Sequence, residues 1–337
     1  MPVNIRANYH YGVMLPEYAF MNYLSEDYSS GFELNYAWQT TGKSIWEKLY
    51  RYPAFGIGFY YSTLSNEAVF GKQYSLYPHY TIHIIEKENF DFNYQLGTGL
   101  TYATRKFDFN NNAGNVAIGS HMNIHFHTNF EAKYRVYKNV FVNGGIAFNH
   151  LSNANLSEPN LGLNFGTLFA GISYTTGSPA ARNHEEITPL EPGFEYAATF
   201  YAGMKHTRTF ESFQYPAFSL SFDACRRTGH KFAFGGGADF FYDSSVEIQM
   251  LRLNKPYNPS DSYTSGLHAT AEFVYNRFSL ILQQGVFLGL TDKLNGRSVY
   301  NRSIARFRFS KHLFASATMK SYFVILDFPE IGIGYHW

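Results

Sequence analysis

Residues 92–103 read Phe92-Asn93-Tyr94-Gln95-Leu96-Gly97-Thr98-Gly99-Leu100-Thr101-Tyr102-Ala103. Most even positions carry large apolar or aromatic side chains, and the odd positions carry small or polar ones. Because successive side chains of a strand point to opposite faces, this alternation predicts a β-strand with one apolar face. The same period recurs over 232–243, 280–290 and most of the chain. The polar face is rich in Gly, Asn, Gln and Asp, which favours a transmembrane barrel over a soluble sandwich.

The composition agrees with a membrane barrel. Of the 337 residues, 19% are aromatic, including 33 Phe and 28 Tyr, and only 16% are charged. Aromatic rings of this kind form girdles at the two membrane–water interfaces of a barrel. The formal net charge of +1 gives no indication of a nucleic-acid partner. The sequence contains no run of 18 apolar residues, so we expect no transmembrane helix.

About sixteen strands can be marked along the chain, with boundaries uncertain by several residues. Tight turns alternate with longer polar loops, and this asymmetry is typical of bacterial outer-membrane barrels. With both termini in the periplasm, the long loops are extracellular, and the segment 41–53 is a long periplasmic connection. The long loops are expected at 106–119, 153–161, 248–263 and 292–298. The strands are expected to begin near residues 3, 30, 54, 74, 89, 120, 139, 162, 192, 214, 230, 264, 278, 299, 311 and 328.

Residues 177–191 form a linker-like stretch, which we expect to be periplasmic. They separate a first half, 1–176, from a second half, 192–337, and each half has about eight strands. The preferred interpretation is one wide antiparallel barrel of 14–16 strands. Two eight-stranded barrels in tandem are the alternative, and the sequence leaves both open.

The two ends of the chain bear on its location. The N-terminus has no hydrophobic run, so we expect a mature sequence from which a signal peptide is absent. The last strand ends with Ile331, Ile333, Tyr335 and Trp337 on one face, and this resembles the C-terminal signal of outer-membrane barrels. We therefore expect the protein in the bacterial outer membrane.

A pair of polar residues interrupts the apolar face of the strand near 139–152. His150 and Ser152 are two positions apart, so they project from one face within mutual reach. That face continues the apolar row that includes Ile146 and Phe148. A polar pair that faces lipid is energetically costly and indicates a function. A nucleophile and base that meet a lipid substrate would supply that function.

The surrounding residues resemble the lipid A 3-O-deacylases of the PagL family. The resemblance rests on His150-Leu151-Ser152-Asn153-Ala154 followed by Pro159-Asn160 and Gly162, and it is specific over 149–170. It implies an outer-membrane hydrolase in which Ser152 is the nucleophile, His150 the general base and then acid, and Asn153 an oxyanion donor. The family's Glu that orients the His is matched here by Asn164. An Asn can orient a catalytic His, although it stabilises the imidazolium less than a carboxylate does.

Several alternatives stay open at this point. Glu158 could replace Asn164 as the residue that orients His150, or the barrel could be an inactive structural protein within an envelope complex, or a passive porin. The second half carries Met319-Lys320-Ser321-Tyr322 near the place of the motif and is expected to be catalytically inactive. We expect lipopolysaccharide and outer-membrane lipid as partners, and no metal or other cofactor. The histidines of strands near 74 and 120 are expected to face a polar lumen: His79, His83, His121, His125 and His127.

Overall fold

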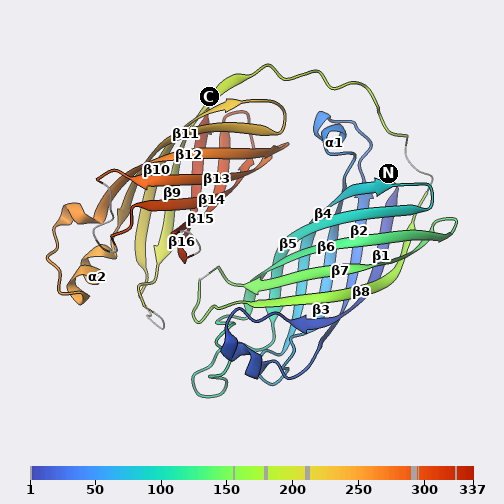
Figure 1. Cartoon of the computed structure of the whole chain (residues 1–337), viewed down its shortest axis with the longest axis horizontal. Helices are drawn as coiled ribbons and strands as arrows, with labels where there is room; N and C mark the ends of the chain where they lie inside the picture. The colour runs from blue at the N-terminus through green and yellow to red at the C-terminus, as the bar shows by residue number, and fades with distance from the viewer. Residues whose placement is uncertain are drawn as a thin grey trace. The chain divides into compact units, whose positions relative to one another are not determined.

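The computed structural model describes residues 2–154, 156–177, 181–208, 213–289, 294, 296–322 and 325–337. Parts of the predicted linker (178–180) and of the predicted loops (155, 292, 293 and 295) lie outside this range. The chain divides into two compact units, Met1–Ile187 and Thr188–Trp337, and each contains one closed eight-stranded antiparallel β-barrel (Figure 1). Among the described residues, no helix is long and apolar enough to cross a membrane.

The first barrel runs through its strands in chain order, and the eighth strand pairs with the first. A 3-10 helix, η1 (Ala19–Leu24), follows the first strand, and a short helix, α1 (Ile45–Leu49), lies in the predicted connection 41–53. The strands are β1 (Val3–Met14), β2 (Ser29–Gln39), β3 (Ala54–Thr63), β4 (Lys72–Glu86), β5 (Phe90–Ala103), β6 (Met122–Tyr137), β7 (Val140–Ser152) and β8 (Leu163–Thr175).

The second barrel closes in the same way, by pairing of its last strand with its first. Its helices, α2 (Val246–Arg252) and η2 (Pro259–Ser262), lie in the connection between the third and fourth strands. The strands are β9 (Gly193–Lys205), β10 (Tyr215–Arg227), β11 (Phe232–Asp243), β12 (Tyr263–Tyr275), β13 (Phe278–Phe287), β14 (Val299–Arg308), β15 (Leu313–Tyr322) and β16 (Ile325–His336).

The structure confirms the sixteen strands and their order, and every strand begins within three residues of the predicted position. The preferred single wide barrel is wrong, and the chain adopts the tandem alternative. The reason lies in the strand edges: β8 pairs with β1 from Asn4↔Thr175 to Met14↔Phe165, so no edge is left for β9. Likewise β16 pairs with β9. Closure removes the exposed edges of both sheets.

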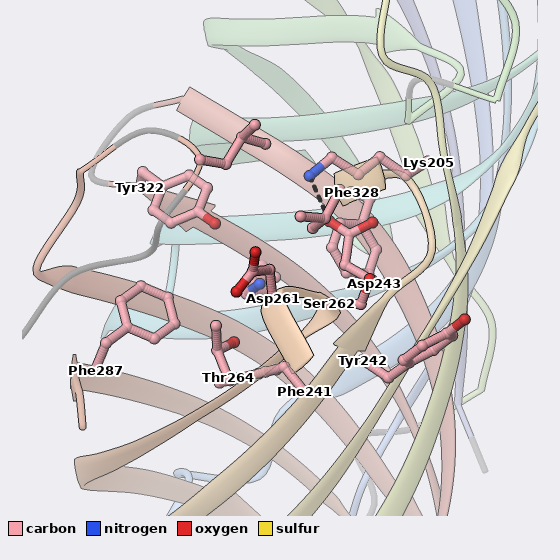
Figure 2. A pocket seen from close by; sticks show the side chains of 13 residues that line it. Lys205, Phe241, Tyr242, Asp243, Asp261, Ser262, Thr264, Phe287, Tyr322 and Phe328 are labelled. Atoms are coloured by element: carbon pink, nitrogen blue, oxygen red, sulfur yellow. Dashed lines mark hydrogen bonds and ion pairs between the residues drawn. The ribbon is translucent and has the colours of Figure 1, made fainter. Parts of the chain in front are cut away.

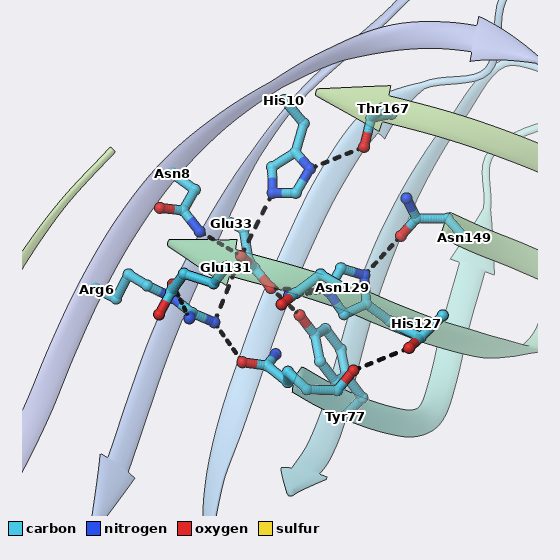
Figure 3. Close-up of polar contacts among 12 residues, drawn as sticks. Arg6, Asn8, His10, Glu33, Tyr77, His127, Asn129, Glu131, Asn149 and Thr167 are labelled. Carbon is cyan, nitrogen blue, oxygen red and sulfur yellow. Dashed lines mark hydrogen bonds and ion pairs between the residues drawn. The ribbon is translucent and has the colours of Figure 1, made fainter. Parts of the chain in front are cut away.

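Each barrel is apolar outside and polar inside, as the alternation predicts. Leu168 and Ile331 are 67% and 74% exposed on the outer walls. In the first barrel, Arg6 bonds to the carboxylate of Glu131, and Tyr77 bonds to the carboxylate of Glu33 (Figure 3). An eight-stranded barrel is just wide enough for such side chains to fill it. The histidines His79, His125 and His127 are buried in this interior.

The interior of the second barrel is also filled by paired charges. The guanidinium of Arg302, fully buried, donates to Asp239 at 3.0 Å and to Glu330 at 2.9 Å. Toward one end, the ammonium of Lys205 lies 2.9 Å from Asp243 and over the ring of Phe328 (Figure 2). Buried charges must be paired in this way because an isolated one is very costly.

The two ends of the first barrel differ. One end, which we call the loop end, carries the connections 15–28, 64–71, 104–121 and 153–162, whereas the opposite turn end carries 40–53, 87–89 and 138–139. An apolar cluster fills the lumen at the loop end. Its members come from these loops and from the inward faces of the strands: Met14, Met21, Leu64, Phe70, Ala103, Ala117, Ile118, Leu151, Leu163 and Phe165.

The described part of the predicted linker, beyond residue 180, has no regular secondary structure. Its first residues dock on the turn end of the first barrel. Arg182 donates two hydrogen bonds to Glu86, at 2.6 and 2.9 Å, and lies over the ring of Tyr52. The hydroxyl of Tyr52 donates to the carbonyl of Asn183 at 2.9 Å.

Candidate active site

His150, Ser152 and Asn164 meet on the outer wall of the first barrel, at the loop end. His150 and Ser152 are the last outward-facing residues of β7, and Asn164 lies opposite His150 in the register of β7 and β8. All three side chains are half-buried. The period of two therefore places the two β7 residues side by side, and pairing with β8 adds the third.

The three side chains form a continuous hydrogen-bonded chain. Nδ1 of His150 lies 2.7 Å from Oδ1 of Asn164, and Nε2 of His150 lies 2.9 Å from Oγ of Ser152. With Oδ1 of Asn164 accepting, the imidazole proton sits on Nδ1, and the lone pair of Nε2 faces the serine hydroxyl. This is the order of groups that activates a serine for attack on a carbonyl carbon. Asn164 is thus the residue whose side-chain oxygen contacts Nδ1 of His150.

The inward-facing residues that alternate with these three pack inside the barrel, behind the site. Leu151 and Leu163 are fully buried, and Phe165 is nearly so, and all three belong to the apolar cluster at the loop end. They alternate with the site residues along the same strands. Because the cluster also contains side chains from three loops, the loop end supports the backbone under the site. This support was not visible in the sequence.

Gly162 closes the loop beside His150. Its φ is +74°, and a Cβ built there would lie 3.0 Å from Cε1 of His150. A side chain at 162 would thus both strain the left-handed backbone and press on the imidazole. This explains the glycine of the motif at that point.

Asn153 lies inside the loop that follows β7, whereas His150 and Ser152 lie on the outer wall. Its side chain is buried, and its Nδ2 donates to Oγ of Ser120 at 3.2 Å and to the carbonyl of Ser157 at 2.8 Å. Its backbone N–H donates to Oδ1 of Asn160 at 2.9 Å. All of its N–H groups therefore have protein acceptors. To act as an oxyanion donor, Asn153 must exchange one of these bonds for the substrate oxygen.

The sequence alone does not identify the residues that hold Asn153. Asn160 belongs to the sequence motif, whereas Ser120 and Ser157 lie outside it. Asn160 and Ser157 lie in the same short loop as Asn153, so their proximity could have been suspected. Ser120 is 33 residues away, and only the pairing of β6 with β7 brings it close.

The second barrel has a partial counterpart. On β15, Met319 and Ser321 are two positions apart and share the outward parity of the strand. Met319 thus takes the position that His150 has on β7, and a thioether cannot act as a base at a serine. The corresponding strand of the second barrel has the serine but not the imidazole.

Two protein-family models match the chain. Residues 30–173, which include most of β2 and β8 and all the strands between them, match the model described as "Lipid A 3-O-deacylase (PagL)". Residues 194–337, which contain the second barrel, match the model described as "Acyloxyacyl hydrolase, C-terminal domain". A search of curated proteins finds no match.

Solved structures with a similar chain path include outer-membrane proteins. Neisserial surface protein A (NspA) has 13% sequence identity and a TM-score of 0.36, covering 51% of this chain and 96% of its own. The outer membrane enzyme PagL has 14% identity and a TM-score of 0.33, covering 49% of this chain and 97% of its own. CdiB from Acinetobacter baumannii has 8% identity and a TM-score of 0.22, covering 99% of this chain and 59% of its own.

Proposed function

We propose, on the premise that this chain belongs to the PagL family of outer-membrane lipid A deacylases, that its first barrel hydrolyses an acyl ester of lipid A. The observation that carries the proposal is the hydrogen-bonded chain from Asn164 through His150 to Ser152 on the lipid-facing wall. A substrate with its esters near the membrane surface would meet these groups at the loop end. In the outer membrane, that end faces the cell exterior.

The reaction follows from the positions of the three groups. Nε2 of His150 takes the hydroxyl proton of Ser152 as Oγ attacks the ester carbonyl carbon. The protonated imidazole then gives this proton to the leaving sugar oxygen, and an acyl-serine remains. A water molecule, deprotonated by the same His150, hydrolyses the acyl-serine and releases the fatty acid. Asn164 keeps the imidazole oriented through both steps.

Asn153 is proposed to stabilise the oxyanion of the tetrahedral intermediate. Of its three hydrogen bonds, the one to Oγ of Ser120 is the longest, at 3.2 Å, and it is the bond we expect to exchange for the substrate oxygen. A donor of this kind typically lowers the activation barrier by about 2.7–4 kcal/mol. Ser120 then retains its own bond to the carbonyl of Met122.

The interiors of the barrels favour this function over a passive pore. In the first barrel the apolar cluster fills the lumen at the loop end, and in the second the ion pairs of Arg302 cross the lumen. An open porin needs a wide aqueous channel, which eight strands do not leave. We therefore expect no large single-channel conductance from the purified protein in planar bilayers.

The experiment that tests the proposal is mass spectrometry of lipid A after incubation with the detergent-purified protein. The 3-O-linked acyl chain is the first to follow, because the matching family model is described by that activity. We expect the wild type to remove one acyl chain, and Ser152→Ala and His150→Ala to remove none. Ser321→Ala is the matched control, since Ser321 faces outward on β15 without a neighbouring histidine. Intact lipid A after incubation with folded wild type would refute the proposal.

A further inference from the structure

The lumen of the first barrel contains a polar cavity that opens at the turn end. Its volume is about 680 Å³, within the range of small-molecule sites in proteins. The apolar cluster fills the lumen at the loop end, so the cavity is closed on that side. Small inward-facing residues of two neighbouring strands leave the room for it, Ala37 on β2 and Ala54 and Gly56 on β3. An eight-stranded barrel can hold one small ligand in this way.

Buried polar groups without a protein partner line the inner part of the cavity. The amide of Asn35 and the imidazole of His79 belong to side chains that are 3% and 4% exposed. Neither the two polar atoms of the amide nor the two ring nitrogens have a hydrogen-bond partner in the described part of the chain. The same holds for Nε2 of Gln95 and Nε of Arg6. Most buried polar groups of proteins are hydrogen-bonded, so their concentration here indicates a place for a polar molecule.

The charges around these groups offset one another. Arg6 bonds through a terminal nitrogen to the carboxylate of Glu131 (Figure 3). Toward the turn end, Asp91 lies opposite Lys133 in the register of β5 and β6. The inner part of the cavity therefore offers neutral donors and acceptors beside paired charges, and a charged ligand would be costly to desolvate there. Hydroxyl groups both donate and accept, so they match an amide and an imidazole.

The linker lies at the entrance of the cavity. Arg182 and His184 line it, and Arg182 is held by its two hydrogen bonds to Glu86 at the end of β4. The hydroxyl of Tyr52 holds the residue between them through the carbonyl of Asn183. Because the loop end is filled, a molecule reaches the inner part of the cavity from the turn end, past these linker residues.

We propose that the cavity binds a small uncharged polyhydroxy compound, of the size of a mono- or disaccharide, and that residues 182–184 narrow its entrance. The amide of Asn35 and the imidazole of His79 exchange hydrogen bonds with the ligand hydroxyls, and Gln95 donates to one of them. In the orientation proposed above, the turn end faces the periplasm, so the ligand comes from that compartment. The site is separate from Ser152 and does not depend on the hydrolysis of lipid A.

The first test is saturation-transfer NMR on the detergent-purified full chain, with glucose and sucrose as the ligands. We expect transfer to both sugars, and at least about tenfold weaker binding by Asn35→Leu, which removes two hydrogen-bonding atoms. Ala54→Phe fills the cavity and should abolish the transfer. Ala132→Phe is the matched control, because Ala132 faces outward on β6, and it should bind both sugars as the wild type does. Folding of each variant is verified by its heat-modifiable migration in gel electrophoresis.

Charged sugars test the class of ligand. Glucuronate and glucosamine have about the size of glucose but carry a charge, and we expect at least about tenfold weaker binding of both. Tighter binding of either one would overturn the assignment to an uncharged ligand. Equal transfer in wild type and Ala54→Phe would place the sugar elsewhere, and no transfer to folded wild type would mean a cavity that holds water only. Either result would overturn the inference and leave the proposed function standing.

Labelling of a thiol inside the cavity tests the entrance. The chain has one cysteine, Cys225 in the second barrel, so Ala54→Cys in a Cys225→Ser background places a single thiol in the cavity. We expect Arg182→Ala to raise its rate of reaction with a small polar methanethiosulfonate several-fold, since both bonds to Glu86 are lost. Lys138→Ala, at the exposed turn 138–139, is the control and should leave the rate unchanged. An unchanged rate in Arg182→Ala would overturn the role of the linker, and labelling that sucrose does not slow would overturn the site.

Discussion

The replacement of Asn164 by aspartate tests the central geometry of the site. Aspartate has the shape of asparagine, so Asn164→Asp keeps the 2.7 Å contact with Nδ1 of His150 and changes only its charge. The side-chain amide of Asn164 can turn either its oxygen or its nitrogen toward the imidazole. Only the oxygen accepts a hydrogen bond and so keeps the proton on Nδ1, because the nitrogen donates. A carboxylate accepts with either oxygen, so it favours the productive tautomer of His150 throughout.

The magnitude follows from hydrogen-bond energies. A neutral hydrogen bond contributes about 0.5–1.5 kcal/mol, and one to a charged group about 1.5–3 kcal/mol. The difference of about 1–1.5 kcal/mol applies when the imidazolium forms, that is, in the transition state. At about 1.36 kcal/mol per factor of ten, Asn164→Asp should raise kcat about five- to thirteenfold. Asn164→Ala loses the whole neutral bond, so it should lower kcat about two- to thirteenfold.

The assay is the initial rate of fatty-acid release from lipid A, measured by liquid chromatography and mass spectrometry at saturating substrate. Wild type, Asn164→Asp and Asn164→Ala are compared at equal amounts of folded protein. Unchanged kcat in both variants would refute the role of Asn164 as the residue that orients His150. A decrease in Asn164→Asp as large as in Asn164→Ala would show that a charge at this lipid-facing position is not tolerated.

Two further predictions concern the supports of the barrels. Leu151 is fully buried, so Leu151→Ala should lower the free energy of unfolding by about 2–5 kcal/mol, measured by urea unfolding in lipid. It should also reduce lipid A hydrolysis in the release assay. Unchanged stability would contradict a packed cluster behind the site. Arg302→Met removes the ion pairs that the guanidinium makes with Asp239 and Glu330, and it should destabilise the second barrel by about 3–5 kcal/mol in the same unfolding measurement. Arg226→Met, at an exposed position, should change stability by less than about 0.5 kcal/mol.

The strands and the two faces of the wall could be predicted from the sequence alone. The period of two is a local property, so Phe92 to Ala103 reveals its own outward and inward sides without reference to any other strand. The same reasoning places His150 and Ser152 on one face, two residues apart, and identifies a polar pair on an apolar wall. The resemblance over 149–170 then added Asn164, whose contact with His150 depends only on the β7–β8 hairpin.

The tertiary structure decided what depends on partners far apart in the chain. One wide barrel and two narrow ones have the same alternation and the same number of strands. They differ only in whether β8 pairs with β9 or returns to β1, and no local pattern encodes that choice. The same limit applies to Asn153, which is held by Ser120 from another strand end. It applies as well to Leu15, whose N–H reaches the carbonyl of Asn164 only because β1 closes the barrel beside β8. Local periodicity determines which way a side chain faces, whereas closure of the sheet determines which residues it meets.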